Sequence, residues 1–267
     1  MKVFISADME GITTTTLWDH CETLEKPALS SYHAQQMTNE VKAACEGAIA
    51  AGADYILVKD AHDSGTNIDI AQLPECVEVI RNWSGHPYSM VTGINPEFDA
   101  CLFIGYHSAA GRDGNPLSHT MSGAPLWVKI NGRKVSEFML YSWAAAFEKV
   151  PTVFLAGDRM LCDDYRDLHP MLRTVAVKDG FGGMIKAMHP KVACDRIRTE
   201  VEAALRQDLS HALCTLPTDF EVEICYKEHK LATRRSFFPG YSKEDDNTIH
   251  MHTDSLYDVL NSINFLI

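Results

Sequence analysis

Short apolar runs alternate along the chain with longer segments of helical periodicity. The runs are rich in β-branched and aromatic residues, as buried strands are, and they cover residues 2–7 (KVFISA), 55–59 (YILVK), 100–106 (ACLFIGY) and 152–157 (TVFLAG). Between the first two runs, apolar residues recur at helical spacing from Ser31 to Gly52, and this glycine is placed to end the helix. Strands that alternate with helices predict an α/β fold with a mostly parallel sheet flanked by helices.

A different pattern begins in the middle of the chain. Asn131 and Gly132 stand between two alternating apolar segments, which predicts a tight hairpin turn, and residues 137–149 then predict a helix. After about residue 190 the chain shows a helical segment, the strand-like FEVEICY and an amphipathic segment at its end. We therefore expect a main α/β domain over residues 1–190 and a smaller α+β portion over residues 191–267.

Charge and cysteine usage narrow the class of protein. The formal net charge is -12, from 24 Lys and Arg against 36 Asp and Glu, and this argues against a nucleic-acid partner. No apolar run approaches the ~20 residues that span a bilayer, and the first apolar stretch is too short for a signal peptide. The eight cysteines form no C-x-x-C pair and suit reduced, mostly buried thiols. We expect a cytoplasmic protein that binds neither nucleic acid nor membrane.

Four candidate metal ligands fall at the carboxyl ends of the predicted strands, where open α/β sheets bind their ligands. Asp8 and Glu10 follow the first strand, His62 the second and His107 the third. An isolated acidic pair is more often explained by a helix cap or a turn, but the coincidence of four indicates a shared site. Oxygen and nitrogen donors of this kind suit Zn²⁺, Mn²⁺ or Co²⁺, and the surplus of carboxylates suits two bridged metals.

Other polar residues leave alternatives open. His119 lies in a loop rich in Gly, Ser and Pro, and is either a catalytic group or a solvent-exposed loop histidine. Asp60 either orients an imidazole or forms part of a turn. His250 and His252 are read as strand residues that face one side, with no further ligand beside them.

The motifs at these positions resemble a known family. S-A-D-M-E-G-I, K-D-A-H-D-S, F-I-G-Y-H-S-A, L-S-H-T-M and I-N-G-R-K-V-S-E-F occur in the order seen in the D-aminopeptidase family of dinuclear zinc peptidases. The resemblance implies that His119 is the catalytic histidine and that the zinc ligands are Asp8, as the bridge, Glu10, His62, His107 and Glu137. Glu137 is assigned only by the resemblance, because a glutamate near a helix start is ordinarily a favourable N-terminal charge.

The resemblance also implies an activity and an assembly. It implies a metalloprotease with two Zn²⁺ per subunit, or Mn²⁺ or Co²⁺ in their place. This enzyme would hydrolyse small peptides or amides with an N-terminal D-amino acid through a metal-activated water, as a homo-oligomer, specifically a homodecamer. The alternative is another two-metal amidohydrolase on the same scaffold, such as an amidase or a cyclic-amide hydrolase. A non-catalytic metal-binding or ligand-sensing protein is disfavoured, since His119 would then have no role.

Two positions depart from the family pattern. Lys59-Asp60-Ala61-His62 stands where the family commonly has N-D-S-H, so that a hydroxyl beside the histidine is missing. After the fourth strand, A-G-D-R replaces A-G-D-D, and Arg159 is therefore expected to place a positive charge near the cleft. These departures bear on substrate preference more than on metal binding.

Overall fold

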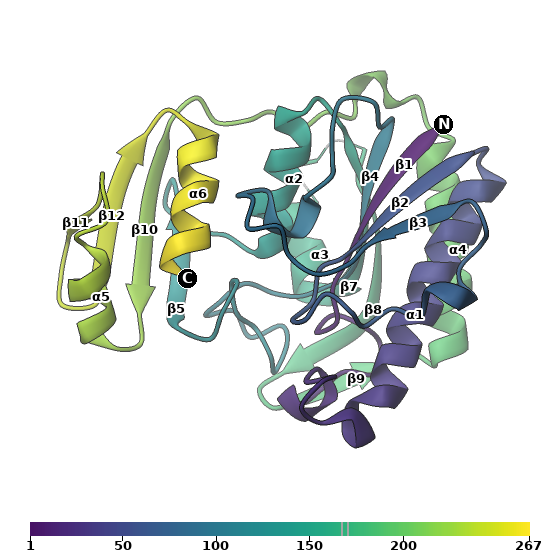
Figure 1. Cartoon of the computed structure of the whole chain (residues 1–267), viewed down its shortest axis with the longest axis horizontal. Helices are drawn as coiled ribbons and strands as arrows, with labels where there is room; N and C mark the ends of the chain where they lie inside the picture. Colours follow the sequence, from purple (N-terminus) through teal and green to yellow (C-terminus); the bar gives the residue numbers. More distant parts are fainter. Residues whose placement is uncertain (167, 170) are drawn as a thin grey trace.

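The computed structural model describes residues 1–166, 168–169 and 171–267 (Figure 1). Its strands are β1 (Lys2–Ala7), β2 (Tyr55–Asp60), β3 (Val77–Ile80), β4 (Ala100–Tyr106), β5 (Pro125–Ile130), β6 (Arg133–Lys134), β7 (Thr152–Asp158), β8 (Arg173–Phe181), β9 (Met184–Ala187), β10 (Phe220–Tyr226), β11 (Ser242–Lys243) and β12 (Thr248–Thr253). Its α-helices are α1 (Pro27–Ala50), α2 (Glu137–Phe147), α3 (Arg159–Tyr165), α4 (Pro190–Leu205), α5 (His229–Arg235) and α6 (Leu256–Leu266).

The first sheet has the strand order β3-β2-β1-β4-β7-β8-β9, and all neighbours are parallel except β8 and β9. The four predicted apolar runs form its central strands β1, β2, β4 and β7. Burial on both faces explains why these strands are almost continuously apolar. The predicted α/β fold class with a mostly parallel sheet is therefore confirmed.

Helices cover both faces of this sheet because side chains alternate along each strand. Val3 and Ile5 of β1 point into a cluster formed with α1 and α4, which pack against each other. Phe4 points to the opposite face and joins a second cluster with α2. Figure 1 shows α2 between the two sheets and α1 with α4 on the outer side of the first sheet. The helix predicted from Ser31 begins earlier, at Pro27, and ends at Ala50, two residues before Gly52 at φ +101°.

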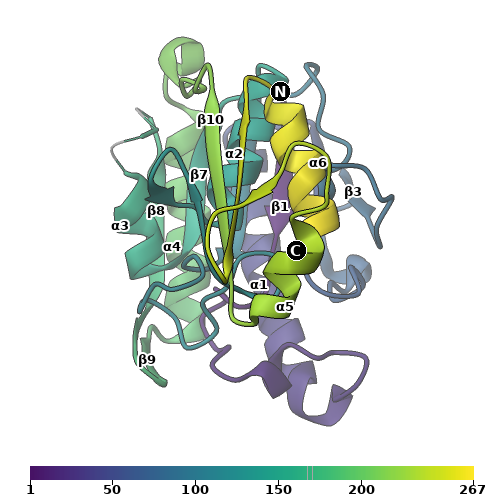
Figure 2. The ribbon, with the colours of Figure 1, turned by 90° about the vertical axis from the view of Figure 1, so that its left-hand side faces the viewer.

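The second sheet is antiparallel, with the order β11-β12-β10-β5-β6. Its β5–β6 hairpin turns at Asn131 and Gly132, both with positive φ, as predicted for this dipeptide. Seen from its own side (Figure 2), this sheet lies in front of the first one, with α5 and α6 beside it. In the second sheet β5 pairs with β10, and beside the first sheet α4 packs on α1. Each sheet with its helices therefore contains segments from before and from after residue 190. A separate domain over residues 191–267 stays a prediction.

Two other expectations concern the whole chain. The eight cysteine thiols are free, and six of them are buried, as their scattered spacing predicted. Within the described ranges, no helix combines the length and the apolar character that crossing a bilayer requires.

Candidate metal centre

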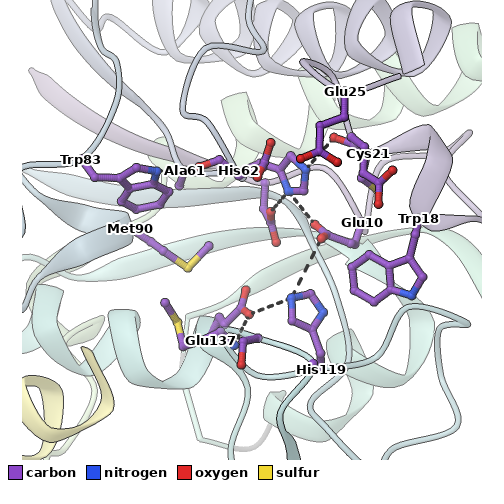
Figure 3. Close-up of a pocket in the computed structure, with 16 residues that line it drawn as sticks. Glu10, Trp18, Cys21, Glu25, Ala61, His62, Trp83, Met90, His119 and Glu137 are labelled. Atoms are coloured by element: carbon purple, nitrogen blue, oxygen red, sulfur yellow. Dashed lines mark hydrogen bonds and ion pairs between the residues drawn. The ribbon is translucent and has the colours of Figure 1, made fainter. Parts of the chain in front are cut away.

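The five predicted metal ligands converge at the carboxyl edge of the first sheet, and the structure buries all of them. Asp8 directly follows β1, His107 directly follows β4, and His62 lies two residues after β2. Glu10 lies on the turn after β1, and Glu137 is the first residue of α2. Figure 3 shows Glu10, His62 and Glu137 pointing toward one another across the pocket.

A close approach between two backbone segments brings the acidic turn to the site. The chain leaves the extended conformation after β1, and the backbone N–H of Gly11 donates to the carbonyl of Gly105 at 2.7 Å. A Cβ on Gly11 would lie 1.8 Å from the carbonyl oxygen of Tyr106, so a larger residue does not fit. Gly105 has a φ of +75°, which favours glycine at this position. These two glycines hold Asp8 and Glu10 against the end of β4.

The distances divide the donors into two groups that share Asp8. Oδ1 of Asp8 lies 3.2 Å from Nδ1 of His62, while its Oδ2 lies 3.5 Å from Nε2 of His107. Oε2 of Glu10 is 3.0 Å from Nδ1 of His62, and Oε2 of Glu137 is 3.3 Å from Nε2 of His107. The two oxygens of Asp8 therefore face different histidines, as a bridging carboxylate requires.

Several of these atoms are buried without a hydrogen-bond partner. Within the described chain, Oδ2 of Asp8, Oε2 of Glu10 and Nε2 of His107 make no hydrogen bond. Leaving such atoms unpaired costs about 1–3 kcal/mol each, so native proteins rarely tolerate them without a bound partner. One donor atom from each of Asp8, His107 and Glu137 lies within 4.8 Å of the others. These oxygen and nitrogen donors fit divalent cations such as Zn²⁺.

The pKa shifts of Asp8 and His107 reflect two effects, burial and the crowding of several carboxylates. Burial and the adjacent Glu10 carboxylate raise the pKa of Asp8 to about 8. Burial opposes protonation of His107, but the surrounding carboxylates, Glu137 foremost with Glu10 and Asp8, together outweigh it and raise the pKa of this imidazole to about 10. Positive charge among the carboxylates would relieve both shifts.

A buried lysine that the sequence reading missed anchors the acidic turn. Lys178 lies on β8, and its ammonium donates to the carbonyl oxygens of Glu10, Ile12 at 3.0 Å and Thr15 at 2.7 Å. The side-chain amide of Asn115 donates to the same Glu10 carbonyl at 3.0 Å. The available signal was a lysine within the apolar segment V-A-V-K. Both contacts fix the backbone that carries the Glu10 carboxylate.

Asp158 fixes the backbone segment that carries His107, as Lys178 fixes the segment that carries Glu10. Its carboxylate accepts from the backbone N–H of Ser108 at 2.7 Å and from the Ser108 hydroxyl at 2.6 Å. It also caps α3 by accepting from the N–H of Leu161 at 2.9 Å. Asp158 ends a parallel strand at the same sheet edge, and this position was the signal that could have revealed it.

Hydrogen bonds decide between the two roles considered for Asp60. Asp60 accepts from the backbone N–H groups of Asn67 at 2.6 Å and Ile68 at 2.9 Å, so it stabilises a turn. The His62 imidazole instead donates from Nε2 to the carbonyl of Cys21 at 3.1 Å. This bond leaves Nδ1 of His62 facing the carboxylates.

The expectation for Arg159 needs a correction. Its guanidinium lies 3.6 Å from Asp179 on β8 and lines another pocket, beside Arg166 and Arg196. Arg159 is the first residue of α3, and the pairing with Asp179 draws its side chain away from the metal centre. It therefore does not line the cleft between the candidate ligands.

His119 is not a solvent-exposed loop histidine, since its side chain is 12% exposed. Its Nδ1–H donates to the carbonyl of Leu117 at 2.8 Å, and its Nε2 lies 3.5 Å from Oε1 of Glu137. The ring stacks on His107 with centroids 4.3 Å apart. Burial and the positive charge of His107 lower the pKa of His119. The imidazole is therefore neutral near pH 7, with a free Nε2 beside the carboxylates.

An open pocket of about 440 Å³ gives access to these groups. Its walls include the aromatic and thioether side chains of Trp18, Trp83 and Met90 (Figure 3), and also that of Met121. Carboxylates outside the candidate ligands also line it, namely Glu22, Glu25 and Asp63, whereas lysine and arginine are absent from its described lining. The pocket is therefore acidic and partly apolar.

Comparison with known proteins gives three concordant matches. A family profile described as D-aminopeptidase matches residues 1–265. The curated D-aminopeptidase of Bacillus subtilis (strain 168) is 30% identical over 244 residues, which cover 90% of this chain and 86% of the relative. The solved structure of the Zn-dependent D-aminopeptidase DppA from Bacillus subtilis, described as a self-compartmentalizing protease, aligns with a TM-score of 0.92. That alignment covers 100% of this chain and 96% of the other at 24% identity, and it shows the same fold.

Proposed function

Because the chain belongs to the D-aminopeptidase family, we propose that it is a zinc-dependent aminopeptidase that hydrolyses short peptides or amides with an N-terminal D-amino acid. The observation that carries this proposal is the set of buried, unpaired donor atoms on Asp8, Glu10 and His107. Asp8 and Glu10 line an open pocket beside a neutral histidine, His119, and His107 stacks on that histidine. Buried groups with shifted pKa values in a cleft are typical of active sites.

We propose two Zn²⁺ per subunit, with Mn²⁺ or Co²⁺ acceptable to the same donors. Asp8, Glu10 and His62 would hold one ion, while Asp8, His107 and Glu137 would hold the other. The separate orientation of the two Asp8 oxygens supports its role as the bridge. Bound zinc would supply an activated water molecule and polarise the scissile carbonyl.

His119 is the catalytic histidine in this proposal. The hydrogen bond from Nδ1 to Leu117 fixes the tautomer, so Nε2 is free to accept a proton and pass it to the leaving amine. The stacking on His107 and the edge contact with Trp18 hold the ring in place. A histidine fixed in this way transfers protons without first reorienting.

The pocket favours a substrate with a protonated amine and an apolar or cationic side chain. Glu22, Glu25 and Asp63 attract positive charge, and Trp18 and Trp83 offer apolar surface. An acidic side chain would meet only like charge among these lining residues. We therefore propose short peptides with uncharged or basic N-terminal residues as the preferred class.

Exposed apolar side chains support an oligomer. Leu24 is 69% exposed, Phe237 83% and Phe265 68%, and such residues are commonly buried between subunits. The structural relative is described as a self-compartmentalizing protease. These observations support an oligomer, and we propose the homodecamer that the family resemblance implies, located in the cytoplasm.

A substrate panel tests the proposal directly. The metal-loaded protein is assayed with D- and L-aminoacyl anilides, dipeptides, simple amides and cyclic amides, before and after chelation. We expect cleavage of substrates with a free D-aminoacyl terminus, lost on chelation and restored by Zn²⁺. Cleavage of L-substrates alone, or of amides without an amino group, would replace this function with that of another two-metal amidohydrolase.

A further inference from the structure

Cys21 lies at the metal centre although neither its spacing nor the family resemblance singled it out. It directly follows the short 3-10 helix Trp18–His20 and is only 2% exposed. Figure 3 shows it beside His62 and Glu10 at one side of the pocket. Its thiol sulfur, a carboxylate oxygen of Glu10 and a ring nitrogen of His62 all lie within 4.8 Å of one another.

The immediate surroundings of the thiol suit a bound cation. Its hydrogen bond to the carbonyl of Leu17 is long, at 3.9 Å, and the neighbouring Oε2 of Glu10 has no hydrogen-bond partner within the described chain. Sulfur ligands lie about 2.3 Å from zinc, and nitrogen or oxygen ligands about 2.0–2.2 Å. Ligands at these distances from one ion lie closer together than the 4.8 Å limit that these donors meet, so the side chains would move toward the ion on binding.

The backbone of Cys21 already takes part in arranging this half of the site. Its carbonyl accepts from Nε2 of His62 at 3.1 Å, and this bond turns Nδ1 of the ring toward Glu10. Such a contact fixes the tautomer and orientation of a metal-binding histidine. Cys21 therefore orients the His62 imidazole through its carbonyl and places its own sulfur beside it as a further donor.

We propose that Cys21 is a further metal ligand, binding through its thiolate the cation that Glu10 and His62 hold. This inference rests on the proposed function, because it requires the metal centre. On binding, the S–H bond breaks, the proton passes to solvent and a sulfur–metal bond forms, without any change of oxidation state. The thiolate raises the negative charge of the ligands from about -3 to about -4, which equals that of two divalent cations in magnitude.

A thiolate ligand from Cys21 would give the two cation positions different numbers of protein donors. Asp8, Glu10, His62 and Cys21 give four protein donors on one side, which is the number found in closed, structural zinc sites. Asp8, His107 and Glu137 give three on the side where His119 stacks on His107. Three protein donors leave a position open, as in catalytic zinc sites. Substrate and water would therefore bind at the second position.

Cobalt spectroscopy tests the ligand without relying on turnover. The metal-free, full-length protein is loaded with Co²⁺, whose visible bands report binding at the centre and whose near-ultraviolet charge-transfer band reports a thiolate ligand. We expect both signals in the wild-type protein, and loss of the near-ultraviolet band alone in Cys21→Ser. Competition with a chelator should show that one of the two ions is held about tenfold or more weakly in the variant.

The matched control is Cys45→Ser, which changes another buried thiol on α1 and should keep both signals. A wild-type protein with visible bands but no charge-transfer band would overturn the thiolate ligand and leave the metal centre intact. Retention of the charge-transfer band in Cys21→Ser would do the same. Failure of the wild-type protein to bind cobalt would overturn the centre and the ligand together. A wild-type spectrum without the charge-transfer band overturns the proposal even if Cys21→Ser folds poorly.

Discussion

Two clusters of histidine and carboxylate in this molecule differ in burial and in charge. On the second sheet, His250 and His252 of β12 face Glu221 of β10, with Nε2 to carboxylate distances of 2.6 and 3.8 Å. These histidines face one side, as predicted, but the Glu221 carboxylate lies beside them, contrary to the expectation that no further ligand accompanies them; their side chains are 32% and 58% exposed. At the metal centre, Asp8 and Glu10 are only 2% and 3% exposed. Water can satisfy the first cluster but not the second, so several unpaired buried donors gathered in one place identify the functional site better than residue type does.

The largest effect should follow from removing the shared carboxylate of the buried cluster. On the proposed arrangement, Asp8→Ala would remove a ligand from both cation positions, so we expect fewer than two metals per chain. We also expect activity to fall by about 10⁴-fold or more, equivalent to ~5.5 kcal/mol in the barrier. Elemental analysis and an assay with a D-aminoacyl anilide measure these effects. Glu221→Ala in the exposed cluster is the control and should change neither. Two tightly bound metals in Asp8→Ala would show that Asp8 is not the bridge.

Replacement of His119 separates proton transfer from metal binding within the buried cluster. In His119→Ala we expect activity to fall by about 10²–10⁴-fold, the usual contribution of a general acid or base. Both metals should remain, because the five other donors are unchanged. Metal content and kcat are measured on the same preparation, with His250→Ala as the histidine control. Loss of one metal would instead make His119 a ligand, and undiminished turnover would remove its assigned role.

The buried site could be predicted from the sequence only where local patterns determine position. Asp8, His62 and His107 follow apolar strands, and the common edge of a parallel sheet brings such residues together. Glu137 has an ordinary explanation at a helix start, so spacing alone could not select it. Lys178 lies 168 positions from Glu10, and its contact depends on how distant strands pack.

The same distinction applies to the fold. The central strands β1, β2, β4 and β7 are apolar on both faces, and the sequence reading found all four. Strand β8 has only a short apolar stretch, V-A-V, between charged and polar residues, and its burial pattern is mixed, so it was not predicted. The pairing of β5 with β10 joins segments about 90 residues apart, such as Ile130 and Val222, and no local pattern encodes that partner. Sequence periodicity therefore predicts the buried central strands, whereas the pairing of distant strands depends on tertiary packing.

A third histidine sharpens the comparison, because it is buried without a carboxylate. His169 and His107 are both 1% exposed. Nδ1 of His169 has no hydrogen-bond partner within the described residues, and its Nε2 lies 3.4 Å from the Ser142 hydroxyl. Burial alone lowers the pKa of His169 from 6.5 to about 4, whereas the carboxylate beside His107 raises that pKa to about 10.

The low pKa of His169 predicts a loss of stability in mild acid. Between pH 6.5 and about 4 the unfolded chain binds a proton that the folded protein does not, so the free energy of unfolding falls as the pH is lowered through this window. The His169 contribution should reach about 3 kcal/mol near pH 4 and change little below it. Urea unfolding of the wild type and of His169→Gln at several pH values measures this contribution of His169 to the free energy of unfolding. Parallel pH profiles for the two proteins would contradict the assignment.

The smallest effect is expected in the exposed cluster itself. His250→Ala removes the imidazole that lies 2.6 Å from Glu221, but both groups remain accessible to water, which replaces the lost contact. We therefore expect the free energy of unfolding to change by less than about 1 kcal/mol, with unchanged metal content and turnover. Urea unfolding, elemental analysis and the anilide assay, each run beside wild type, check the three expectations. A loss of bound metal in His250→Ala would mean that an exposed cluster with a single carboxylate can hold a cation. In that case, burial and surplus negative charge would not be what distinguishes the two clusters.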